Sequence, residues 1–197
     1  MSERYIWVIP DNQSRWIWKY FAIHLARKMG MRPVLIVASQ EDHKFYAKQG
    51  DSLFPGEIIL RDDYYGHLVK RHVDKVMEPE VVFRLARDYE ERYQISLMRS
   101  MLLADRHLGR GFVPGAAGYP RSSISDSANI VNSLTACLHS IKFWEQLAEI
   151  HPPSLVISNG GGGGLAGKPY ALLCRELGIP MRILFSSRFG NSYFWGH

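Results

Sequence analysis

The chain has 197 residues and a formal net charge of +5 at pH 7, and a chain of this length can bury roughly 70% of its unfolded surface in one domain. It has no apolar stretch near the ~20 residues of a membrane-spanning helix and no signal-peptide pattern at its N-terminus, which predicts a cytoplasmic protein. Basic residues are spread without a Lys/Arg block, so the charge favours anionic ligands or an anionic membrane surface over nucleic acid. Cys137 and Cys174 are expected to be buried, reduced thiols.

The first third of the chain predicts a βαβ unit. Residues 4–10 (RYIWVIP) and 33–38 (PVLIVA) are apolar runs typical of strands that are buried on both faces. Between Ser14 and Gly30, a spacing of i, i+3 and i+4 predicts a helix and its buried face. That face comprises Ile17, Tyr20, Phe21, His24, Leu25 and Lys28. A short helix over 40–49 and a strand over 57–60 follow.

The middle of the chain predicts one long helix over residues 80–108. Arg92, Arg99 and Arg106 recur every seven residues and so lie near one line on its surface. One interpretation is that this line of arginines is a solvated face of the helix. The alternative is that the C-terminal end of the helix projects into a cleft, together with Asp105, Arg106, His107 and Arg110. Residues 109–126 hold four glycines and two prolines, which indicates a long loop. A helix over 127–150 follows.

A run of five glycines follows a short buried strand at residues 155–157. Gly160, Gly161, Gly162, Gly163 and Gly164 precede a helical pattern that ends at Gly178. Strand, glycine loop and helix form the layout that binds phosphate at a helix N-terminus. The run nearly matches GxxxxGK[ST], but Pro169 stands where that motif needs a hydroxyl for magnesium. A turn that binds no ligand is the alternative.

With a fifth strand at residues 181–185, the pattern predicts an α/β fold: a single Rossmann-like, doubly wound parallel sheet of about five strands, with helices on both faces. The expected strand order is 3-2-1-4-5. Strand positions expected to be buried are Ile6, Val8, Leu35, Val37, Val156 and Ile183. Ligands of such sheets bind where the first and fourth strands end, which brings together the loops at 11–13 and 159–164. The aromatic residues 193–195 are assigned to no element and are expected at a domain boundary.

Three segments together suggest a family. They are YIWVIPDN in the first strand, ERYQISLMRSMLLADRHLGRGF on the long helix, and SLVISNGGGGGLAGKPYALLCRELGIP near the end. This combination resembles the N-terminal half of GT-B-fold glycosyltransferases of bacterial capsular and surface polysaccharide biosynthesis. The resemblance implies that residues 1–197 form the Rossmann-like acceptor-side domain. The donor-binding C-terminal domain would then lie outside this chain, and the chain alone would be inactive.

The resemblance implies sugar transfer from a nucleotide-sugar donor to a carbohydrate or lipid-linked acceptor, without a metal or a cofactor. A side chain must deprotonate the acceptor hydroxyl. The catalytic candidates are Asp11, Asp105 and His107, although Asp11 is equally suited to a capping role in its loop. The candidate ligand-binding residues are Asn12, Asn159, Gly160, Gly161, Gly162, Gly163, Gly164, Lys168, Arg106 and Arg110. The alternative function is a stand-alone domain that binds a nucleotide or a sugar phosphate.

Overall fold

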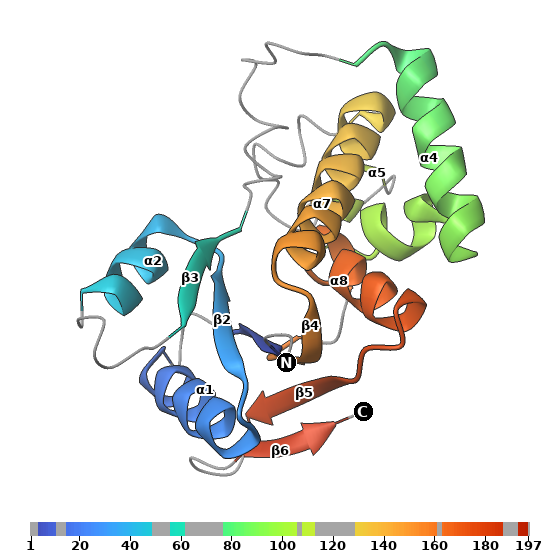
Figure 1. The fold of residues 1–197 in the computed structure, drawn as a ribbon. Helices are drawn as coiled ribbons and strands as arrows, with labels where there is room; N and C mark the ends of the chain where they lie inside the picture. Colours follow the sequence, from blue (N-terminus) through green and yellow to red (C-terminus); the bar gives the residue numbers. More distant parts are fainter. Residues whose placement is uncertain are drawn as a thin grey trace. The chain divides into compact units, whose positions relative to one another are not determined.

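The computed structural model describes residues 4–10, 15–48, 56–61, 77–105, 108–112, 129–160, 163–186 and 193–196 (Figure 1). The chain divides into two compact units. The first, here called the sheet unit, comprises Met1–Asp62, Glu145–Gly161 and Cys174–His197. The second, the helical unit, comprises Asp63–Trp144 and Gly162–Leu173. The assignment of residues 1–197 to a single domain stays a prediction.

The sheet unit contains a sheet whose first five strands are parallel. The strands are β1 (Tyr5–Ile9), β2 (Arg32–Val37), β3 (Glu57–Leu60), β4 (Pro153–Ser158), β5 (Met181–Ser186) and β6 (Tyr193–Gly196). Their order is β3-β2-β1-β4-β5-β6. The structure therefore confirms the α/β class, the five predicted strands and the order 3-2-1-4-5. The six strand positions predicted to be buried are all buried.

The sixth strand corrects the interpretation of the aromatic residues at 193–195. These residues form β6, which pairs antiparallel with β5 and places Leu184 opposite Trp195. The prediction that they belong to no element is wrong. A strand such as β5 exposes unpaired N–H and C=O groups on its open side, and β6 provides partners for them.

Helix α1 (Arg15–Met29) has the predicted bounds but buries a different face. The predicted face contains Ile17, Tyr20 and His24, and all three are exposed. The helix instead buries the stripe Trp18, Lys19, Ala22, Ile23 and Ala26. Both stripes have helical spacing, but the observed one offers small side chains at two positions. A helix can approach a sheet more closely over alanine than over Tyr20 or His24, and Trp18 fills the remaining space.

The core of the sheet unit lies between the strands, α1 and α2 (Gln40–Ala47). It contains Ile6, Val8, Trp18, Ala22, Ile23, Ala26, Met31, Leu35, Val37, Tyr46, Ile157 and Leu184. The start of α2 is capped by Ser39, whose hydroxyl accepts a hydrogen bond from Asp42 N at 3.1 Å. None of the helices in the described ranges is long and apolar enough to cross a membrane.

The predicted long helix over 80–108 is interrupted in the helical unit, so that prediction is wrong. Helix α4 (Pro79–Tyr93) ends at Gln94, which adopts the left-handed conformation with φ 52°. The Glu90 carboxylate then accepts a hydrogen bond from Leu97 N at 2.6 Å, and a π-helical turn η1 (Met98–Leu102) follows. Arg92 and Arg99 therefore lie on different elements and do not share a face of one helix.

The remaining helices in the described ranges are α5 (Gly109–Phe112), α7 (Ile130–Ile150) and α8 (Gly164–Glu176). The short helix α5 occupies the first four residues of the predicted loop; residues 113–126 lie outside the described ranges. Helix α7 agrees with its prediction, and Asn129 caps it by accepting from Asn132 N at 2.9 Å. Gly178, the predicted end of α8, adopts φ +66° two residues after the last residue of the helix, Glu176.

Candidate functional site

The carboxyl ends of β1 and β4 lie side by side, as the strand order predicts. Ile9 is in register with Ser158, and Asn159 N donates a hydrogen bond to Ile9 O at 3.3 Å. The loops that follow these two strands therefore start at the same edge of the sheet. This is the topological switch point at which open α/β sheets bind ligands.

The turn after β4 is held by Ser158, a residue that the sequence interpretation missed. Its buried hydroxyl donates to Gly160 O at 2.9 Å and lies 3.4 Å from Gly160 N, which donates to it. Asn159 and Gly160 are half-buried. The available signal was a Ser at the end of a strand, where its hydroxyl commonly bonds the backbone two residues on.

The predicted site residues are distributed over both compact units. Asn159 and Gly160 belong to the sheet unit, whereas Gly163, Gly164, Lys168 and Asp105 belong to the helical unit. The following predicted residues lie outside the described ranges: Asp11, Asn12, Arg106, His107, Gly161 and Gly162. Arg110 lies on α5, and only its backbone is described. Within the helical unit, the structure brings Asp105 against Gly164.

Asp105, a predicted catalytic residue, is buried and fully engaged with backbone groups. Only 5% of it is exposed. Its Oδ1 accepts a hydrogen bond from Leu108 N at 3.1 Å, and its Oδ2 accepts one from Leu165 N at 3.2 Å. The carboxylate thus caps the first turn of α8, where the helix dipole favours negative charge. This geometry is that of a structural capping residue and argues against Asp105 as the catalytic base.

Position 164 requires a glycine for two reasons, its backbone conformation and the close approach of Asp105. It has φ +65°, a region that L side chains rarely adopt. A Cβ at this position would lie 2.8 Å from Asp105 Oδ2 and 3.2 Å from Asp105 Cα. A Cβ at Gly163, in contrast, would meet no described atom within 4 Å. The last glycine of the run therefore serves chain geometry, in agreement with the alternative interpretation of the run as a turn.

Pro169 lies inside α8, and its effect is compensated from α7. A proline has no N–H, so it cannot bond the carbonyl four residues earlier, which belongs to Leu165. The buried hydroxyl of Ser140 donates to Leu165 O at 2.7 Å and satisfies that carbonyl. The sequence interpretation missed Ser140, although Pro169 within a helical pattern was a signal that such a donor was needed. Lys168 is half-buried beside this proline.

We expect Ser140→Ala to lower the free energy of unfolding by about 1–3 kcal/mol, because it leaves the buried Leu165 carbonyl without a partner. Ser133 provides a matched control. It is also a fully buried serine of α7, but its hydroxyl has no hydrogen-bond partner among the described residues. Ser133→Ala should therefore be neutral or stabilising. Urea denaturation of both variants measures the difference, and equal losses would contradict the assigned role of Ser140.

The two cysteines are free and buried, which confirms the prediction of reduced thiols. Burial raises the pKa of Cys137 well above its usual value, and the negative charges of Asp105 and Glu90 raise it further. Burial also raises the pKa of Cys174 to about 12. Both groups are therefore protonated near neutral pH and are poor nucleophiles.

We expect the native chain to react only slowly with a thiol reagent at pH 8. At a pKa of about 12, roughly one Cys174 in ten thousand is ionised, and the thiolate is the reactive form. Denaturation in guanidinium should expose both thiols and raise the labelling rate by orders of magnitude. Mass spectrometry after timed labelling measures both rates; rapid labelling of native Cys174 would contradict the assigned protonation state.

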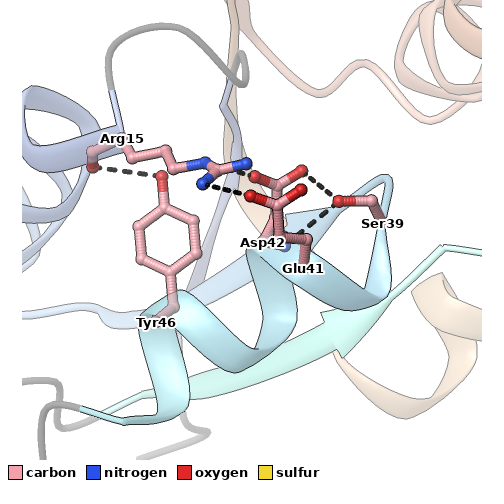
Figure 2. Close-up of polar contacts among 5 residues, drawn as sticks. All are labelled: Arg15, Ser39, Glu41, Asp42 and Tyr46. Atoms are coloured by element: carbon pink, nitrogen blue, oxygen red, sulfur yellow. Dashed lines mark hydrogen bonds and ion pairs between the residues drawn. The ribbon is translucent and has the colours of Figure 1, made fainter.

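A polar cluster lies where α1 and α2 begin, after the carboxyl ends of β1 and β2 (Figure 2). Arg15 forms ion pairs with Glu41, at 3.1 Å, and with Asp42, at 2.6 Å. The Ser39 hydroxyl donates to Asp42 Oδ2 at 2.6 Å, and Tyr46 OH donates to Arg15 O at 3.1 Å. Arg15 is thus held by two carboxylates of the following helix. The cluster ties α1 to α2 and leaves Arg15 poorly suited to bind a ligand phosphate.

The described residues include no group of three His, Cys, Asp or Glu side chains that could hold a metal ion. No protein-family model matches the sequence, and a search of curated proteins finds no match.

Proposed function

We propose that the chain is the acceptor-side, Rossmann-like part of a cytoplasmic GT-B glycosyltransferase that uses a nucleotide-sugar donor and a carbohydrate or lipid-linked acceptor. The observation that carries the proposal is the switch point, where the hydrogen bond from Asn159 N to Ile9 O joins the starts of two loops. The resemblance of three sequence segments to these enzymes adds the reaction type. Transfer then requires the donor and the acceptor to be held in a near-attack geometry.

In this proposal, Asp11 is the general base that deprotonates the acceptor hydroxyl. It lies two residues after the end of β1, and the capped carboxylate of Asp105 leaves Asp11 as the better candidate of the two. The loop that begins at Asn159 contributes backbone N–H groups toward the anionic part of the donor. The proposal includes no metal, since Pro169 stands where a magnesium site would need a hydroxyl.

The second candidate is a nucleotide- or sugar-phosphate-binding domain without catalysis of its own. The burial of Asp105 favours it, because one of three predicted catalytic side chains is committed to backbone hydrogen bonds. Both candidates require an anionic ligand at the loop after β4, so they share the binding step. They differ only in whether a sugar is transferred.

Calorimetric titration of the chain with pyrophosphate, UDP-glucose and GDP-mannose tests the shared binding step. We expect Gly161→Val with Gly162→Val to abolish binding of at least one of these probes, because β-branched side chains block close approach to the backbone. Gly178→Ala is the control, since this glycine follows α8 and lies outside the run. Unchanged affinity in the double variant would mean that the run is only a turn.

Transfer assays with Asp11→Asn separate the two candidates. If the chain or the longer protein that contains it transfers sugar, this variant should keep donor affinity and lose turnover by about 100-fold or more, as removal of a general base typically does. Full turnover in Asp11→Asn would overturn the assignment of the base. Donor binding without any transfer would favour the second candidate.

A further inference from the structure

The outer face of α1 combines exposed apolar side chains with positive charge. Ile17 and Tyr20 are 43% and 65% exposed, although a packed helix normally buries such side chains. A shallow hollow of about 640 Å³ follows this face. It is lined by Ile17, Tyr20, Phe21, Ile23, His24 and Arg27. The sequence pattern had assigned much of this face to the core, but the structure packs the opposite stripe of α1 on the sheet and leaves this face exposed.

The charged side chains of α1 are all basic. The helix contains four Lys and Arg residues and no Asp or Glu. Arg15 is paired with Glu41 and Asp42, and Lys19 is buried, so neither provides much charge to solvent. Arg27 and Lys28 are exposed in the last turns, next to the apolar hollow. The exposed face is therefore aromatic, aliphatic and basic.

We propose that this face docks on the surface of a membrane that contains anionic phospholipids. Positive side chains attract anionic headgroups, and amphipathic aromatic rings such as that of Tyr20 are favoured at the boundary between headgroups and acyl chains. The helix is packed on the sheet along its other side, so it adsorbs at the surface and does not insert deeply. The inference gives the proposed enzyme a surface partner, but it is tested without donor or acceptor.

Co-sedimentation with lipid vesicles tests the proposal. The chain should sediment with vesicles of phosphatidylglycerol and phosphatidylcholine and stay in solution with phosphatidylcholine alone, and high salt should release it. Arg27→Gln with Lys28→Gln should weaken binding about 25-fold, because each basic residue near an anionic surface contributes about fivefold. Ile17→Ser with Tyr20→Ser should weaken binding at every salt concentration, since it removes the apolar part of the contact.

Arg84→Gln with Arg87→Gln provides the matched control. These residues are also exposed, and the pair removes the same charge from α4, which carries four acidic residues of its own. The affinity of this control for vesicles should stay within about threefold of the wild-type affinity. A larger change would approach the roughly fivefold loss expected when one cation is removed from the membrane-facing surface. Circular dichroism melting checks that every variant is folded.

Four results would overturn the proposal. The first is an absence of binding to phosphatidylglycerol vesicles. The second is an equal loss in the α1 and α4 variants, which would mean that only net charge matters. The third is a wild-type dimer by light scattering that the α1 variants disrupt. The fourth is tighter binding to a single-stranded RNA than to vesicles, which the α1 variants weaken. Because no nucleotide sugar is present, failure here is distinguishable from failure of the proposed enzymatic function.

Discussion

Asp105→Ala is expected to lower the free energy of unfolding by about 2–5 kcal/mol. The substitution removes both acceptors from the buried N–H groups of Leu108 and Leu165, and each buried N–H left without a partner costs roughly 1–3 kcal/mol. It also removes a negative charge from the first turn of α8, where the helix dipole favours one. Chemical denaturation with an unchanged m-value measures the loss directly.

Two further substitutions sharpen this test. Asp105→Asn keeps one acceptor oxygen but places an NH₂ group against the other backbone N–H, so we expect about half the loss. Asp88→Ala removes an exposed carboxylate from α4 and should change stability by less than about 0.5 kcal/mol. An Asp105→Ala variant as stable as Asp88→Ala would show that the two hydrogen bonds contribute little.

Strands β1 to β5 could be predicted because each contains an apolar run between residues that end regular structure, whereas β6 was not predicted. The run of Leu155, Val156 and Ile157, for example, lies between Pro152–Pro153 and the glycines, and it becomes the central strand β4. Strand order then followed from the general preference of such chains. The face of α1 could not be predicted, because two stripes have helical spacing and only the fit against the sheet selects the one with Ala22 and Ala26.

The capping network could not be predicted because its partners are distant in sequence. Leu165 is 60 residues from Asp105 and 25 residues from Ser140, and no local pattern relates them. The end of α4 at Gln94 could not be predicted for a different reason. The sequence has no Gly or Pro there, and the break depends on a left-handed Gln and on the hydrogen bond from Leu97 N to the Glu90 carboxylate. The glycine run could be recognised in the sequence. The sequence could not show that Gly164 needs a positive φ and lies against Asp105, whereas Gly163 does neither.

Gly164→Ala should lower the free energy of unfolding by about 2–4 kcal/mol. Part of the loss is backbone strain, since φ is +65° and a left-handed L residue costs roughly 1–2 kcal/mol. The rest is steric, because the new methyl group would lie 2.8 Å from Asp105 Oδ2 and 3.2 Å from the Asp105 Cα, which cannot rotate away. Overpacking of this kind typically costs a further 1–3 kcal/mol.

The other glycines separate these two contributions to the loss. Gly178 has φ +66°, and a methyl group added there would meet no described atom within 4 Å, so Gly178→Ala measures the strain alone, about 1 kcal/mol. Gly163→Ala adds a methyl group that likewise contacts none of the described atoms and should be nearly neutral. The double variant Asp105→Ala with Gly164→Ala should lose less than the sum of the single losses, because alanine at 105 removes the oxygen that the methyl group meets. Strict additivity would mean that Gly164 is required by its φ angle and not by the close approach of Asp105.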